Sequence, residues 1–320
     1  MTQTEKQKMM LTAPVEGLIC RMAVPTIISM LITALYNMAD TYFVGKLGSN
    51  AATGAVGVAL PLMAIIQATG FFFGHGSGNS ISRHLGAGDV DDAEKLAACG
   101  FAGAIGAGLI ICVLGQLFLE PLARLLGSTA TILPYAKEYM RYILFAAPYM
   151  TAALVLNNQL RLQGNANFAM IGITSGAVLN VALDPLFIFT FNMGVAGAAA
   201  ATALSQLVSF VILLWALKRA GCVPLRFRYV RYMPSVMGQI FGGGLPSLVR
   251  QGLASLSVMM LNRAAGPYGD AAIAAMSIVG RISQFAGSAV IGFGQGFQPV
   301  CGFNYGAGKR ERVEKAFWFG

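Results

Sequence analysis

The sequence predicts an all-α polytopic membrane protein, and two observations carry this prediction. Of the 320 residues, 56% are hydrophobic and only 11% are charged, with a mean hydropathy of +0.65. Soluble globular domains do not have this balance. Apolar runs also recur along the whole chain, and many are longer than the roughly 20 residues that a helix needs to cross a bilayer. Runs of this length favour spanning helices over the short alternating strands of a barrel.

We predict about eight complete transmembrane helices and the start of a ninth. The expected spans cover residues 18–43, 53–82, 93–119, 135–160, 165–191, 195–218, 237–264 and 271–303, and the ninth begins near Val313. Short loops separate them, at residues 45–50, 83–92, 120–131, 161–165, 192–194, 219–234, 266–270 and 305–312. Glycine, lysine and arginine are frequent in these loops, as is usual between spans.

The distribution of basic residues predicts the orientation in the membrane. With a cytoplasmic N-terminus, fifteen of the 22 lysines and arginines fall on the inner side, among them Lys6, Arg161 and Arg226. This bias follows the positive-inside rule, so we expect a multi-pass protein of the cell inner (plasma) membrane with a cytoplasmic N-terminus. The net charge of +9 then reflects topology and contact with anionic membrane lipid, and we expect no nucleic-acid partner. The five cysteines have no metal or redox spacing.

An internal repeat predicts the domain organisation. Pro25 aligns with Pro246 at an offset of 221 residues, and at an offset of 220 Gly74 aligns with Gly294 and 86–88 with 306–308. Six spans separate the copies, so both have the same orientation, as in parallel transporter repeats. We expect an N-terminal six-helix lobe at 1–218, a cytoplasmic linker at 219–236 and the start of an incomplete C-terminal lobe at 237–320. A full pair of lobes of this size needs about 440 residues.

Two carboxylates stand inside apolar runs, Asp40 in the first span and Asp184 in the fifth. An acidic side chain in a span costs about 2.5–3.5 kcal/mol on insertion scales, so it is seldom kept without a partner or a task. Both helices run from inside to outside, which places both acids in the outer half of one lobe, where they can share a site. The alternative for Asp40 is a carboxylate near a helix end that reaches the outer interface. The repeat has Leu261 at this position, so the acid is specific to the first lobe.

The residues around these acids offer oxygen ligands. Asn180 precedes Asp184 by one helical turn, and Pro185 removes the backbone donor that would bind the carbonyl of Val181. Thr202 lies at a comparable depth in the sixth span. Such a set suits a hard monovalent cation, or protons shared between carboxylates. Possible cavity-lining residues in the first lobe are Tyr36 and Asn37, on the face of Asp40, and Gln206, one turn beyond Thr202.

Further polar residues interrupt the other spans. Pro25 is either a start-of-helix proline or a hinge for bending the first helix. Arg250 and Gln251, in the seventh span, are further candidates to line a cavity, because charged groups in spans face the bundle interior. His75 and His84 have no acid or cysteine at ligand spacing, and we interpret them as ordinary polar residues. No nucleophile and base are arranged for catalysis, so we do not expect an enzyme, and we expect no cofactor other than a coupling ion.

Several stretches resemble the multidrug and toxic compound extrusion (MATE) family of cation-coupled transporters. They are the segment from Tyr36 to Gly45, Leu160 to Asn165, Leu179 to Pro185, Gly194 to Thr202, and Gly244 to Ser247, and together they span almost the whole chain. The resemblance implies twelve helices in two six-helix lobes around a central cleft. It also implies export of organic cations in exchange for Na⁺ or H⁺.

The resemblance assigns roles to individual residues. Asp40, Asn180, Asp184 and Thr202 match the family's first-lobe cation site, which would hold Na⁺ or protons, and Pro25 matches its bending proline. Family members with a second-lobe cation site have an acid in the seventh helix, where this chain has Arg250 and Gln251. We therefore place the coupling site in the first lobe.

We therefore hypothesise an antiporter, expected to be a monomer, that exports small-molecule organic cations by alternating access. The alternative within transport is a lipid-linked oligosaccharide flippase of related architecture, which would line its cleft with several basic residues. A channel would not need a repeat with an acid pair in a single lobe, and a membrane enzyme would need a catalytic cluster.

Overall fold

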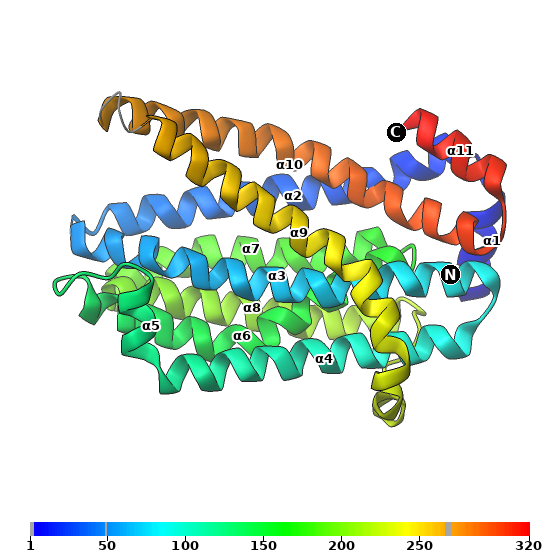
Figure 1. Ribbon diagram of the computed structural model, residues 1–320, viewed down its shortest axis with the longest axis horizontal. Coiled ribbons are helices and arrows are strands. Elements are labelled where there is room, and N and C mark those ends of the chain that lie inside the picture. Colours follow the sequence, from blue (N-terminus) through cyan, green and yellow to red (C-terminus); the bar gives the residue numbers. More distant parts are fainter. Residues whose placement is uncertain (1–2, 49, 266–269) are drawn as a thin grey trace.

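The computed structural model is a bundle of long helices, and it describes residues 3–48, 50–265 and 270–320. Figure 1 shows the long helices running side by side along one axis, with both chain termini at one end. We call this the termini end and the opposite one the far end. The part of the chain that the structure describes contains no strand. The all-α membrane architecture predicted from the sequence is therefore confirmed.

The helices, in chain order, are α1 (Gln3–Thr12), α2 (Val15–Gly45), α3 (Asn50–Ala87), α4 (Val90–Leu117), α5 (Leu119–Leu125), α6 (Leu133–Leu162), α7 (Ala166–Pro185), α8 (Gly194–Arg219), α9 (Met233–Ala265), α10 (Asp270–Gly306) and α11 (Arg310–Phe319). A short π-helix, η1 (Leu186–Thr190), follows α7, and a 3₁₀-helix, η2 (Phe227–Tyr232), precedes α9. Among the described residues, six helices are long and apolar enough to cross a membrane, namely α2, α3, α4, α6, α7 with η1, and α8.

The predicted spans agree with the helices to within a few residues at most ends. The seventh and eighth spans correspond to α9 and α10, and the start of the ninth to α11. Most of the predicted loop 266–270 lies outside the described residues. Two short helices were not predicted. One is α1, and the other is α5, which occupies part of the expected loop 120–131 and contains an ion pair between Glu120 and Arg124 one turn apart.

Glycines let α3 pack closely along α6. Gly70, Gly74 and Gly78 recur every four residues and form one stripe on α3. A Cβ added at these positions would come within 2.4 to 2.8 Å of α6 side chains, which belong to Leu154, Asn158 and Leu162. Only glycine permits this approach. As a result α6 lies in the interior, and most of its residues are buried.

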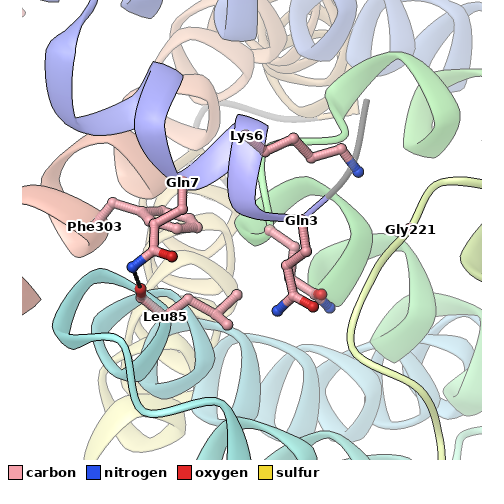
Figure 2. Close-up of a pocket in the computed structure, with 7 residues that line it drawn as sticks. Gln3, Lys6, Gln7, Leu85, Gly221 and Phe303 are labelled. Carbon is pink, nitrogen blue, oxygen red and sulfur yellow. Dashed lines mark hydrogen bonds between the residues drawn. The ribbon is translucent and has the colours of Figure 1, made fainter.

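At the termini end, α1 lies across the bundle and bonds to both halves of the chain. The Nε2 of Gln7 donates to the carbonyl of Leu85 in α3 (2.6 Å), and Lys6 donates to the carbonyl of Ala220. Figure 2 shows Gln7 beside Leu85 and Phe303, with Lys6 extending away from them, and all four residues line a cavity of about 10 Å³. From the other side, Asn304 of α10 donates to the carbonyl of Met10 (3.2 Å).

The region predicted as the second lobe packs on the first by direct backbone approach at the termini end. A Cβ added to Gly86 would lie 2.1 Å from the carbonyl oxygen of Phe303, and one added to Gly306 would lie 1.9 Å from that of Arg83. The termini end is therefore closed between α3 and α10. The division into lobes at residues 219–236 stays a prediction.

The sequence predicts that Arg161 begins the loop 161–165, and this loop assignment is wrong because α6 extends to Leu162. The location of Arg161 on the inner side stays a prediction. Arg161 lies in the last turn of α6 and is 1% exposed. A guanidinium at this depth needs hydrogen-bond acceptors from its neighbours, and three side chains or carbonyls supply them, as described below.

Candidate cation site

The helices α7 and α8 bring together three of the four residues predicted to bind a cation. The Nδ2 of Asn180 donates to Oδ1 of Asp184 (3.3 Å) and to Oγ1 of Thr202 (3.4 Å). All three side chains are buried, with Asp184 fully so. The spacing of one turn between Asn180 and Asp184 places them on one face, as the sequence predicted. Both hydrogen bonds are long, so this contact is loose.

Small residues explain why α8 lies close enough for Thr202 to join this group. A Cβ added to Gly176 would lie 3.0 Å from the carbonyl oxygen of Ser205, and one added to Gly172 would overlap Leu213. The hydroxyl of Ser209 donates to the carbonyl of Gly172 (2.8 Å). Two glycines on α7 and two serines on α8 thus set the distance between these helices.

The helical geometry changes directly after Asp184. Pro185 has no N–H, so the carbonyl of Val181 lacks its regular helical partner, as predicted from the sequence. The chain then continues as the π-helix η1, whose last turn is closed by Phe191 N–H donating to the carbonyl of Leu186 (3.0 Å). Single π-helical turns inside helices are frequent at functional sites.

The fourth predicted residue, Asp40, approaches from α2. It is partly buried, and its Oδ1 is inaccessible to solvent and has no hydrogen-bond partner. Its charge acts electrostatically on Asp184, which places the two carboxylates in one neighbourhood. The alternative that this carboxylate simply reaches the outer interface does not account for a buried oxygen without a partner.

Three buried oxygens in this group lack hydrogen-bond partners, and they are Oδ1 of Asp40, Oδ1 of Asn180 and Oδ2 of Asp184. Buried polar atoms are usually paired, because an unpaired one costs about 1–3 kcal/mol. Among the described residues, no lysine or arginine acts electrostatically on Asp40 or Asp184. The arrangement can therefore accept a small cation or protons.

The other first-lobe residues suggested as cavity-lining lie in different settings. Tyr36 is partly buried one turn before Asp40, and the charges of Asp40 and Asp184 act on its phenol. Asn37 is exposed. Gln206 is partly buried, and among the described hydrogen bonds none joins it to Asn180, Asp184 or Thr202.

Arg250 and Gln251 of α9 lie away from this group. Arg250 is exposed and lines an open cavity of about 560 Å³ together with Pro246 and Leu253. Gln251 is partly buried and has an interaction of its own. The suggestion that Arg250 faces a cavity fits this position.

Pro25 lies well inside α2, which begins at Val15 after Pro14. The interpretation as a start-of-helix proline is therefore wrong. Beyond it, Ser29 donates to the carbonyl of Pro25 (2.9 Å), and Thr33 donates to the carbonyl of Ser29 (2.8 Å). Hydroxyl bonds of this kind, next to a proline, are typical of bent helices.

Sequence reasoning missed Tyr139, which is 1% exposed in α6. The charges of Asp40, Tyr36 and Asp184 all act on its phenol, so it belongs to the same neighbourhood. In the sequence it is one aromatic residue of an apolar run, and no spacing connects it to Asp184, 45 positions later. Only the packing of α6 against α7, which in turn packs against α2, reveals it.

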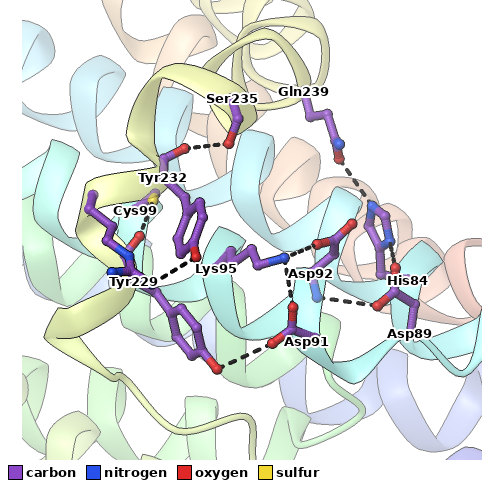
Figure 3. Close-up of polar contacts among 11 residues, drawn as sticks. His84, Asp89, Asp91, Asp92, Lys95, Cys99, Tyr229, Tyr232, Ser235 and Gln239 are labelled. Carbon is purple, nitrogen blue, oxygen red and sulfur yellow. Dashed lines mark hydrogen bonds and ion pairs between the residues drawn. The ribbon is translucent and has the colours of Figure 1, made fainter.

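A second polar cluster lies at the termini end, where His84, Asp89 and Asp92 have ligand atoms within 4.8 Å of one another (Figure 3). Local structure accounts for these contacts. Asp89 is the N-cap of α4 and accepts from the backbone N–H of Asp92 (3.2 Å), and Lys95 pairs with Asp92 (2.7 Å). The Nε2 of His84 lies 3.1 Å from Oε1 of Gln239 in α9. The interpretation of His84 as an ordinary polar residue fits these bonds, but the expectation that it has no acid at ligand spacing is wrong, because its Nδ1 lies 3.1 Å from Oδ2 of Asp89.

His75 differs from its interpretation as an isolated polar residue. It is 3% exposed, stacks on Phe71, and its Nδ1 is 2.8 Å from Oγ of Ser247 in α9. It therefore connects α3 to α9.

Comparisons with known proteins agree with these observations. The MatE family model matches residues 25–186 and 246–320. A multidrug export protein MepA of Staphylococcus saprophyticus is 30% identical over 284 residues, which cover 88% of this chain and 63% of that protein. The chain thus spans less than two thirds of this relative.

Solved structures agree as well. The structure described as MATE in the straight conformation is 30% identical, with a TM-score of 0.92, and the alignment covers 97% of this chain and 70% of the other. The structure described as MATE in the bent conformation is 29% identical, with a TM-score of 0.90, and the alignment covers 98% and 70%.

Proposed function

This chain belongs to the MatE family, and from this premise we propose that the full-length protein is an antiporter that exports organic cations in exchange for Na⁺ or H⁺. The relative from S. saprophyticus is named as a multidrug export protein, which supports small-molecule export as the activity. The observation that carries the cation coupling is the set of three buried, unpaired oxygens on Asp40, Asn180 and Asp184.

In the proposed mechanism the coupling ion and the drug favour different conformations of the first lobe, so binding of the ion releases the drug. The ion enters between α2, α7 and α8 and binds the unpaired oxygens, with Thr202 as a further ligand. Binding satisfies polar atoms that are otherwise buried without partners, so the ion favours the conformation in which these helices close around it. The drug is released as the cavity contracts.

The bending of α2 is the proposed link between ion binding and drug release. Pro25 and the hydroxyl bonds after it weaken the regular helical ladder about four turns before Asp40. Two solved structures are described as MATE in the straight conformation and MATE in the bent conformation, which supports a bend as part of the cycle. Asp40, on the far side of Pro25, would move toward α7 when it shares a cation with Asp184.

The test is gradient-driven transport by the full-length protein in liposomes. We expect a fluorescent organic cation to move against its own gradient when a pH or Na⁺ gradient is imposed, and the effective gradient identifies the ion. Asp40→Asn and Asp184→Asn should each abolish this movement, because a neutral amide has no negative charge to bind Na⁺ and does not take up a proton as a carboxylate does.

The matched control is Glu120→Gln, which makes the same chemical change in an exposed acid of α5, ion-paired to Arg124 and Lys137. Its transport should equal that of the wild type. Unchanged transport in both aspartate variants would disprove the first-lobe coupling site. Failure under either gradient, with competition by a lipid pyrophosphate for binding, would favour the flippase.

We also propose that the termini end faces the cytoplasm and that the protein acts as a monomer. The orientation is supported by the basic residues of η2 and of α11, which lie at that end. Labelling of Tyr305→Cys in sealed cells, after the native cysteines are replaced, tests the orientation, and light scattering in detergent tests the oligomeric state.

A further inference from the structure

The fully buried Arg161 plays no part in the proposed cation site, and its surroundings indicate a separate role. It is the largest side chain among those buried almost completely. Its guanidinium donates to three acceptors, the carbonyl of Gln295, Oε1 of Gln298 (3.0 Å) and Oδ1 of Asn158 (2.6 Å). Asn158 is on its own helix, whereas the other two acceptors are on α10.

The carbonyl of Gln295 is available because of Pro299. In a regular helix this carbonyl would accept the N–H of residue 299, but proline has none. Arg161 supplies the missing donor from another helix. The contact thus depends on complementary features of two helices 134 positions apart, a missing donor in α10 and a buried cation in α6.

The neighbouring backbones leave little room for another arrangement. A Cβ added to Gly296 would lie 2.4 Å from Cα of Ala23 in α2, and one added to Gly302 would overlap Ser82 in α3. The segment of α10 that binds Arg161 is therefore packed tightly against the first six spans. These spans cannot separate from α10 at the termini end without removing two of the three acceptors of Arg161.

We propose that Arg161, with the carbonyl of Gln295 and the amide of Gln298, is the latch that holds the termini end closed and sets the balance between the two access states. This inference rests on the proposed function, since a latch has a role only in a protein that alternates. While the latch is closed, Arg161 is satisfied by α10. When the termini end opens, water replaces these acceptors, so the step is reversible.

The test is a distance measurement across the termini end in the full-length protein. Nitroxide labels are placed at Ala87 of α3 and Tyr305 of α10, both exposed, after the native cysteines are replaced. Pulsed electron resonance then gives the populations of closed and open forms. We expect a short distance to dominate in the wild type, and Arg161→Met to raise the ratio of open to closed by about tenfold, the effect of losing a hydrogen bond to a charged group.

Two further variants keep Arg161 in place. Gln298→Met removes one acceptor, and Pro299→Ala restores a backbone N–H that competes for the carbonyl of Gln295. Each should raise the open population by less than Arg161→Met does. If Arg161→Met does not fold, these two variants decide the question, and unchanged distances in both would overturn the proposal.

Matched controls separate the latch from general effects. Pro61→Ala makes the same change at an exposed proline of α3, and Arg226→Met removes an exposed arginine whose partner is Glu94. Neither should alter the distances. Because the measurement needs no substrate, unchanged distances in folded Arg161→Met would overturn the latch even where transport is normal. Transport that fails under every gradient, with distances that respond, would overturn the antiporter instead.

Discussion

The cation site and the latch are both buried and charged, but they differ in how their hydrogen bonds are satisfied. At the cation site, near the far end, three oxygens of Asp40, Asn180 and Asp184 have no partner. At the latch, near the termini end, Arg161 has three acceptors, and only its Nε is unpaired. Buried polar atoms without hydrogen-bond partners mark a place where a ligand can bind. Buried polar atoms whose hydrogen bonds are all made mark a contact that holds the protein together.

The difference also concerns sign and origin. The acidic site is built within the first six spans, from α2, α7 and α8, so it takes no group from α9 or α10. The basic latch joins α6 to α10, so it exists only in one arrangement of the chain. In the proposed mechanism, an ion is exchanged at the acidic site while the latch determines which side is open.

The largest expected effect is that of Asp184→Leu. This variant tests whether the cation site binds a ligand, unlike the latch, or is only a structural contact. We expect gradient-driven transport to fall roughly 100-fold, near the upper end of typical coupling energies. Stability should be maintained or rise by up to about 1–3 kcal/mol, because an unsatisfied buried group is removed. Transport in liposomes and thermal unfolding in detergent measure the two effects. A loss of stability in Asp184→Leu would contradict the distinction.

The next effect concerns the closed termini end. Gly306→Ala should destabilise the protein by about 1–3 kcal/mol, because the new Cβ would meet backbone atoms of Arg83. Unlike a side chain, the backbone cannot rotate away from this contact. The control is Gly294→Ala on the same helix, where a Cβ meets nothing within 4 Å. That variant should gain about 0.5–1 kcal/mol. Equal unfolding temperatures for the two variants would argue against close packing there.

A smaller effect sharpens the composition of the cation site. Thr202→Val keeps the shape of the side chain and removes one oxygen, so the ion concentration for half-maximal transport should rise about tenfold, as for one lost ligand. Ser205→Ala removes a hydroxyl one turn away, which donates to the carbonyl of Thr202 (2.9 Å). Its ion dependence should equal that of the wild type. If both variants respond alike, Thr202 is not a ligand.

The smallest effect is a pH dependence outside both regions. Lys137 and Arg124 lower the pKa of Glu120 below its ordinary value of 4.5. The pairing therefore stabilises the folded protein above that value, and this contribution is lost as the pH falls through the lowered pKa. The unfolding temperature of wild type should exceed that of Glu120→Gln slightly at pH 6 and approach it toward pH 3. A constant difference would show that the pairing does not contribute.

The sequence by itself determined the helices and the candidates for the cation site. The length and apolar character of each run fix a spanning helix, because backbone groups in lipid must bond within their own segment. The turn between Asn180 and Asp184 likewise fixes their common face, since it is a local property of a helix. The loss of the backbone hydrogen bond to the carbonyl of Val181 also follows from the sequence, because Pro185 has no N–H.

Only the tertiary structure decided which distant groups meet. Tyr139 lies near the acids because α6 packs against α7, which also packs against α2, and nothing local in its apolar run indicates this neighbourhood. Arg161 reads as a loop residue in the sequence, whereas its burial follows from the approach of α10, and the free carbonyl of Gln295 is a partner only in three dimensions. Local periodicity depends on a few neighbouring residues, but the satisfaction of a buried charge depends on every helix packed around it.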